Sequence, residues 1–187
     1  MQRIAFAPVP VRFTQSLSHT WLARRWYYTP KTHRAYSVRQ VSPGDRRLLA
    51  EFMHTLGGAA DSERSPSGLT SLLFDRVIAA GNETAVAFAA LENTRGGDRV
   101  VGACAYAPLH DHALFSMAVA TTFRDEQVGR TLLEALVRHA KRVGVRRLTG
   151  AMDWSNQAMK SLAKSTGFTV EPLPGDRTRR NLVLQLR

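Results

Sequence analysis

Hydrophobic residues recur at two different spacings along this chain of 187 residues, and each spacing predicts a kind of element. Steps of three and four residues predict amphipathic helices over residues 45–56, 69–80, 127–143 and 157–166. Short apolar runs bounded by turn residues predict strands over residues 36–41, 84–91, 99–107, 114–120, 146–152 and 180–186. This order predicts a mixed sheet with helices on both faces, an α/β or α+β fold.

Turn residues connect the strands in the middle of the chain. Gly96 and Gly97 predict a hairpin, and residues 108–112 predict a second turn before the next apolar run. Three strands joined by two short turns form an antiparallel meander.

The first 35 residues lack clean periodicity and contain prolines at positions 8, 10 and 30. The chain length suits one domain plus a short extension. We therefore divide the chain into a basic, poorly ordered extension over 1–35 and a folded domain over 36–187. On this division, removal of the extension should leave the domain folded.

The charge is concentrated near the N-terminus. The formal net charge is +11, and residues 1–44 contain seven Lys or Arg and no Asp or Glu. We favour a solvated basic extension. An organelle transit peptide has the same acid-poor composition, whereas an export signal would need an apolar segment that this region lacks. A nucleic-acid contact stays open, because aromatic residues alternate here with Arg24 and Arg25, namely Trp21, Trp26, Tyr27 and Tyr28.

Composition and motif searches exclude several other classes. No run of eighteen apolar residues is present, so no membrane span is expected. The single cysteine, Cys104, cannot form an internal disulfide and lies in an apolar run, which favours a buried thiol in a reducing, cytoplasmic compartment. No Cys/His cluster has metal-ligand spacing, so no metal is expected. Nucleophile-elbow and P-loop patterns are absent, which leaves hydrolase and NTPase functions without support.

The most informative segment is 117–133, where an apolar strand leads through a polar turn into a helix near Gly129. The first backbone N–H groups of a helix have no partner within the helix, and the helix dipole makes that end positive. Such a turn suits a phosphate or diphosphate. Strand, turn and helix alone are a weak signal, because most such units bind nothing.

The pattern around this turn resembles the diphosphate-binding loop of the GNAT superfamily of N-acetyltransferases, Arg/Gln-x-x-Gly-x-Gly/Ala. Arg124 and Gly129 match the first and last positions, whereas Gln127 stands where the first glycine is expected. Further residues match the Asn-x-x-Ala/Met-x-x-Leu and Gly-Phe elements that follow in that superfamily, namely Asn156, Met159, Leu162, Gly167 and Phe168. The chain is most similar to the acetyltransferase domain of bacterial protein-lysine acetyltransferases, over residues 36–187.

The resemblance implies acetyl-CoA as co-substrate and a GNAT-like mixed, mostly antiparallel sheet. In that superfamily the strand before the loop binds the pantetheine arm through its main chain, which corresponds here to Met117 and Val119. The loop and helix start would hold the diphosphate through Gln127, Val128, Gly129, Arg130 and Thr131, with the Arg124 or Arg130 side chain alongside. Two residues of the downstream match, Asn156 and Met159, complete the expected cofactor-binding set.

The resemblance is weakest for acid–base chemistry. Many relatives have a glutamate where this chain has Leu114, and many have a tyrosine where it has Ala163. Polar residues just before the strand, at 110–112, could replace the glutamate, and His112 is the favoured base because histidine titrates near neutrality. An exposed polar turn explains the same residues equally well.

Asp153, at the end of a predicted strand, is the second candidate for catalysis, although an acid beside Ser155 also suits a helix start. We therefore expect an N-acetyltransferase in which an amine attacks acetyl-CoA directly in a ternary complex. The acceptor would be a protein lysine, an N-terminal amine or a small amine. The alternative is a catalytically weak or inactive domain that binds an acyl-CoA as a sensor or interaction module.

Overall fold

The computed structural model describes residues 25–29, 31–58, 68–80, 85–109, 111–124 and 127–186. Its centre is an eight-stranded sheet in the order β1-β2-β3-β4-β5-β6-β8-β7. All neighbouring strands are antiparallel except β5 and β6, which are parallel. The strands are β1 Arg25–Tyr28, β2 Ala35–Gln40, β3 Val86–Thr94, β4 Gly97–Leu109, β5 His112–Val119, β6 Arg147–Asp153, β7 Thr169–Leu173 and β8 Asp176–Gln185.

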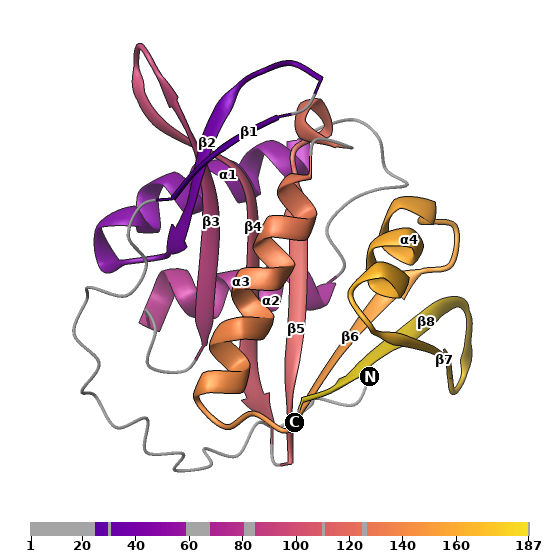
Figure 1. Ribbon diagram of the computed structural model, residues 1–187. Coiled ribbons are helices and arrows are strands. Elements are labelled where there is room, and N and C mark those ends of the chain that lie inside the picture. Colours follow the sequence, from indigo (N-terminus) through magenta and orange to yellow (C-terminus); the bar gives the residue numbers. More distant parts are fainter. Residues whose placement is uncertain are drawn as a thin grey trace.

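Helices cover both faces of this sheet, as expected. Helices α1 (Arg46–Gly58) and α2 (Gly68–Ala80) pack on one face through a cluster that includes Leu49 and Phe74. Helices α3 (Val128–Arg142) and α4 (Gln157–Ser165) pack on the other face through a second cluster. Figure 1 shows α3 crossing the strands on one side, with α1 and α2 behind them. The predicted mixed, mostly antiparallel sheet with helices on both faces is confirmed.

The sheet begins earlier than the expected boundary at residue 36. Residues 25–28 form β1, which pairs with β2, and Tyr27 stacks on Tyr36 with ring centroids 5.4 Å apart. Alternation explains the strand: Tyr27 packs against the core, while Trp26 and Tyr28 are exposed. Removal of residues 1–35 would thus remove a strand of the sheet. The rest of the expected extension, residues 1–24 and residue 30, lies outside the described residues, and its nucleic-acid contact stays a prediction.

Two further details of the fold bear on the sequence expectations. The final strand starts at Asp176 instead of residue 180, because Gly175, with a φ of 80°, lets β7 turn back into β8. Cys104 is buried and its thiol donates to the Leu132 carbonyl at 3.4 Å, and burial raises the pKa of that thiol. Within the described residues, no helix has the length and apolar character that a membrane crossing would need.

Candidate cofactor and active site

The parallel strands β5 and β6 touch at one end and separate toward the other. Their ladder contains only the pairs Ala113–Leu148 and Leu114–Thr149. Beyond these pairs β5 continues along β4 as far as Val119, and β6 continues along β8 (Figure 1). In the part of the chain that the structure describes, no strand therefore pairs with the edge of β5 that faces β6 over 115–119. Main-chain groups at such an edge can hydrogen-bond an extended ligand.

Phe115 and Gly150 mark the point at which the strands diverge. A Cβ atom at Gly150 would lie 2.6 Å from the Phe115 ring and 2.9 Å from the Phe115 carbonyl oxygen. Phe115 also packs against Phe168, with ring centroids 5.2 Å apart. Only a glycine fits under this ring. Sequence reasoning missed both residues, although a glycine inside a predicted strand is the signal of such a close approach.

Helix α3 begins beside the open segment of β5. Its first residue is Val128, and the preceding residue, Gln127, has a left-handed backbone with a φ of 62°. The N–H groups of 127–130 have no partner within the helix, because each lies too near its start. Thr131 differs: its N–H donates to the Gln127 carbonyl at 3.0 Å. The expected set of anion donors is therefore shortened to residues 127–130.

Gly129, in the first turn of α3, lies close to side chains of β5 and α4. A Cβ atom at this position would lie 3.4 Å from Met117 Cε, 3.7 Å from Val119 Cγ2 and 3.5 Å from Leu162 Cδ2. The helix start therefore lies against the open part of β5 and against α4. We call this enclosed position the cradle, and a larger side chain here would press on β5 and α4. Met117, Val119 and Gly129, which belong to the predicted cofactor-binding set, lie close together here.

The other predicted cofactor residues lie on α3, at the start of α4 and at the end of a short 3₁₀ turn. Asn156 caps α4, since its Oδ1 accepts the Met159 N–H at 3.0 Å, and Met159 packs against the core cluster. The Arg130 guanidinium donates to Ser165 Oγ at 2.9 Å, so it is directed toward α4. Arg124 is exposed at the end of the short 3₁₀ turn Thr121–Phe123.

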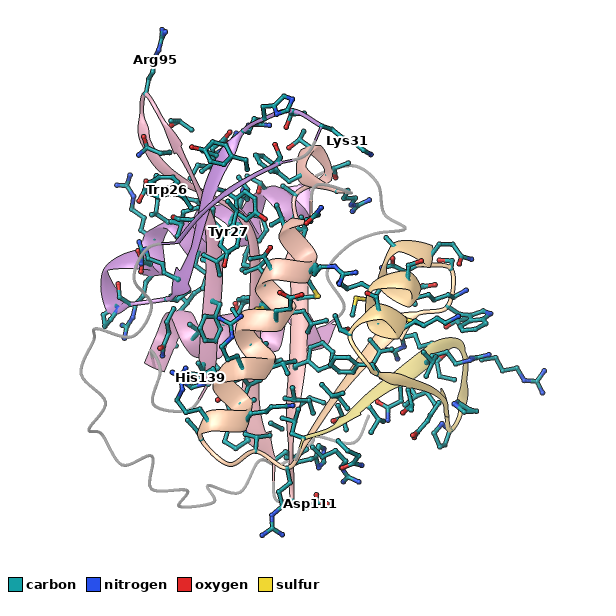
Figure 2. The ribbon with its side chains drawn as sticks, viewed as in Figure 1. Trp26, Tyr27, Lys31, Arg95, Asp111 and His139 are labelled. Atoms are coloured by element: carbon teal, nitrogen blue, oxygen red, sulfur yellow. The ribbon has the colours of Figure 1, made fainter. Side chains whose placement is uncertain are left out.

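His112 lies at the opposite end of β5. The eight residues of the strand span about 23 Å at the usual rise per residue, and the β5–β6 pairs separate His112 from the open edge. Its Nδ1 lies 2.8 Å from Asp111 Oδ1, and Arg147 pairs with the same carboxylate at 2.8 Å. Both contacts, that with His112 first, lower the pKa of Asp111. Figure 2 shows Asp111 at the far end of the molecule from Tyr27 and Lys31. His110 lies outside the described residues.

Asp153, the other predicted catalytic residue, has a local structural role. Its Oδ1 accepts hydrogen bonds from the backbone N–H of Ser155 at 2.8 Å and from its hydroxyl at 2.6 Å. These bonds lower the pKa of Asp153, which makes the carboxylate a weaker base. Across the described ranges, no three His, Cys, Asp or Glu side chains are grouped so that they could hold a metal ion.

Two small polar side chains lie at the divergence point on the face of α1 and α2. Strand alternation places Ser116 and Thr149 there, because their neighbours Phe115 and Leu148 pack with α3. Both are buried, and Thr149 Oγ1 has no hydrogen-bond partner among the described residues. An unpaired buried hydroxyl is costly to the fold, which makes it a candidate for contact with a ligand. Sequence reasoning missed both.

Comparisons with known proteins bear on the family and the fold of the chain. The model of the acetyltransferase (GNAT) family matches residues 48–168. The GNAT domain of PAT from S. lividans is 18% identical and has a TM-score of 0.67, with 87% of this chain and 97% of that chain covered. No curated protein sequence matches the chain.

Two further solved structures share the fold. The structure of yncA from Salmonella typhimurium, solved with its cofactor acetyl-CoA, is 19% identical with a TM-score of 0.61, and the match covers 81% of this chain and 94% of that one. The ribosomal-protein-S18-alanine N-acetyltransferase from Escherichia coli is also 19% identical, with a TM-score of 0.58 and the same coverage of 81% and 94%.

Proposed function

Because the chain belongs to the acetyltransferase (GNAT) family, we propose that it transfers an acetyl group from acetyl-CoA, the co-substrate of this family, to an amine. The main observation behind the proposal is that the N-terminus of α3 lies beside the edge of β5 that β6 leaves unpaired. An anionic diphosphate and an extended, amide-bearing arm are the two groups that this arrangement suits.

The chain's own groups have distinct tasks in this proposal. The N–H groups of 127–130 and the positive end of α3 hold the diphosphate, while main-chain groups of Met117 and Val119 bind the pantetheine arm. Asn156 and Met159, at the start of α4, are proposed to complete the cofactor site, because Leu162 of the same helix packs beside Gly129. Acetyl-CoA supplies an activated acetyl thioester when bound. The protein then orients an amine toward it, and orientation alone accounts for a large share of many rate accelerations.

The acceptor amine must lose a proton before or during attack. His112 and Asp153 stay predictions for this task, but the geometry favours neither, since His112 lies beyond the paired end of β5 and Asp153 is held by Ser155. We propose that the proton leaves through water. The hydroxyls of Ser116 and Thr149, which lie beside the divergence point on the face opposite α3, could orient the amine.

A second candidate function is an acyl-CoA-binding module without turnover. The left-handed Gln127 in the diphosphate turn and the distance of His112 from that turn favour this alternative. Either function suits the cytoplasm, where the free thiol of Cys104 would stay reduced.

Two measurements separate these functions. Calorimetry with acetyl-CoA and with desulfo-CoA measures binding, and release of the CoA thiol with a panel of lysine peptides, N-terminal amines and small amines measures turnover. The proposed transferase should bind acetyl-CoA and release CoA with at least one acceptor class. Binding without release across the panel would select the module, and no binding would refute both functions.

A further inference from the structure

The β1–β2 hairpin contacts the segment that leads into the candidate cofactor turn. The hairpin is closed at Thr29 and Arg34: the Thr29 N–H donates to the Arg34 carbonyl at 2.9 Å, and the Arg34 N–H donates to Thr29 Oγ1 at 2.8 Å. Thr29 is buried, so this closure is fixed in the sheet. It places the Arg34 side chain at the end of β2, close to β3.

Two groups hold the Arg34 guanidinium from different elements. Its Nε donates to Glu92 Oε1 at 2.6 Å, and its central carbon lies 4.1 Å from the centroid of the Phe123 ring. A cation over an aromatic face is attractive, most strongly where water is excluded, and the Phe123 ring is fully buried. Arg34 thus joins β3 to the 3₁₀ turn Thr121–Phe123.

A second contact ties the same hairpin to the other side of the cofactor turn. The Tyr36 hydroxyl lies 3.0 Å from Thr131 Oγ1. The Thr131 hydroxyl in turn donates to the Gln127 carbonyl at 3.1 Å. Phe123 precedes the turn and Thr131 follows it. Residues of the N-terminal hairpin therefore contact the chain on both sides of the N–H groups proposed to bind the diphosphate, at Phe123 and at Thr131.

We propose that Arg34 is a positioning residue for the cofactor site: through Phe123 it fixes the direction in which the chain enters the turn whose N–H groups bind the CoA diphosphate. The inference rests on the proposed function. Arg34, like Tyr36, lies before residues 48–168, the part of the chain that the family model matches, so this support is a feature of this chain outside the matched part.

Arg99 offers a matched control. Its guanidinium pairs with Glu92 Oε2 at 2.7 Å, but no contact joins it to Phe123 among the described residues. Arg34→Met and Arg99→Met therefore each remove one arginine from the same carboxylate, and only the first removes the contact with the cofactor segment. Arg34→Lys keeps a charge for Glu92 and loses the planar group that stacks on the ring.

The test compares the full-length natural chain with the three variants. We expect acetyl-CoA to bind Arg34→Met about tenfold more weakly by calorimetry and Arg99→Met within about twofold of the natural chain, with Arg34→Lys between them. Amide hydrogen exchange without ligand should be faster over 121–131 in Arg34→Met only. Melting temperatures show whether the two methionine variants are equally stable.

Equal acetyl-CoA affinities for Arg34→Met and Arg99→Met, with equal exchange over 121–131, would overturn the inference while leaving the proposed function intact. A uniform rise in exchange over the whole sheet would also overturn it, because Arg34 would then act on global stability only. Failure of the natural chain to bind acetyl-CoA would refute the proposed function, and with it the role of Arg34.

Discussion

The two ends of β5 differ in the chemistry that they present. At the end near α3, the side chains are apolar and the groups available to a ligand belong to the backbone, because β6 has diverged and the helix start is uncapped by any side chain. At the other end, β6 is paired, and the Asp111 carboxylate binds both the His112 imidazole and the Arg147 guanidinium. The side chains that could act as acids or bases thus lie at the closed end, whereas the proposed cofactor site lies at the open end, where the side chains are apolar.

This difference shows why residue identity is a poor guide to such a site. Backbone N–H groups bind an anion whatever side chains they carry, provided that the chain direction is right and nothing blocks the approach. The turn can therefore tolerate Gln127 where relatives have glycine. Positions that keep the approach open should be the sensitive ones, and polar residues at the closed end should be replaceable.

The largest effect is expected at Gly129. In Gly129→Val the added methyl groups would enter the space between Met117 Cε and Leu162 Cδ2, which a Cβ alone would already approach to 3.4 and 3.5 Å. The acetyl-CoA dissociation constant should rise by at least about 100-fold, or roughly 2.7 kcal/mol, with the fold retained. Calorimetry measures the affinity and circular dichroism checks the fold.

Gly96→Val is a control, because Gly96 lies in the β3–β4 turn, where a Cβ would meet only Thr94 Oγ1 at 3.8 Å. It should leave acetyl-CoA affinity unchanged. If Gly129→Val bound acetyl-CoA as tightly as Gly96→Val, the cradle at the α3 start would not be the cofactor site, and the contrast between the two ends of β5 would lose its functional meaning.

The next largest effect is a loss of stability on substitution of Gly150, where β5 and β6 separate. In Gly150→Ala the new Cβ would collide with the Phe115 ring and carbonyl, so either β5 and β6 move apart or Phe115 leaves Phe168. We expect a loss of about 1–3 kcal/mol, a fall in melting temperature of roughly 3–10 °C. Thermal denaturation followed by circular dichroism measures it. A melting temperature within one degree of the natural chain would show that the strands separate without this close contact.

The sequence predicted the architecture well because periodicity reports burial directly. The stretch of leucines that begins at Leu132, with buried positions three and four residues apart, could only be an amphipathic helix, and the meander followed from Gly96-Gly97. The strand at 25–28 was missed because it is four residues long and at the sheet edge. There only Tyr27 packs inward, too short a run for alternation to be seen.

The elements around the candidate site were predictable in part. The start of α3 was expected near Gly129 because Arg124 and Gly129 keep the spacing of a known pattern. The divergence of β5 and β6, the role of Gly150 and the buried Thr149 hydroxyl depend on which strands become neighbours, and no local pattern encodes that. His112 was favoured because it comes just before the predicted strand 114–120. Since β5 runs from His112 to Val119, the length of that strand separates His112 from the turn at the start of α3.

A smaller effect is expected at Gln127, in the turn itself. A non-glycine residue such as Gln127 in the left-handed region destabilises the folded state by about 1–2 kcal/mol. A glycine there removes that strain, but it stabilises the unfolded chain by about 0.5–1 kcal/mol through its greater conformational freedom. Gln127→Gly should therefore stabilise the protein by roughly 0.5 kcal/mol and leave acetyl-CoA affinity equal or higher. Denaturant titration measures the free energy of unfolding. Gln127→Ala, which keeps the strained backbone, is the control and should be less stable than Gln127→Gly.

The smallest effect is expected at the closed end, with His112→Ala. The imidazole binds Asp111, about 23 Å of strand from Val119, so its loss should change kcat/KM by less than about twofold at pH 7 with any amine that the protein acetylates. A general base typically contributes about 10² to 10⁴ in rate. If His112 were the proton acceptor after all, kcat/KM would fall at least about tenfold at pH 7 and much less at pH 9, where more of the amine is already neutral. That profile would contradict the division of β5 into a cofactor end and a structural end, and Asp153→Asn, measured in parallel, would show whether the other predicted carboxylate shares the task.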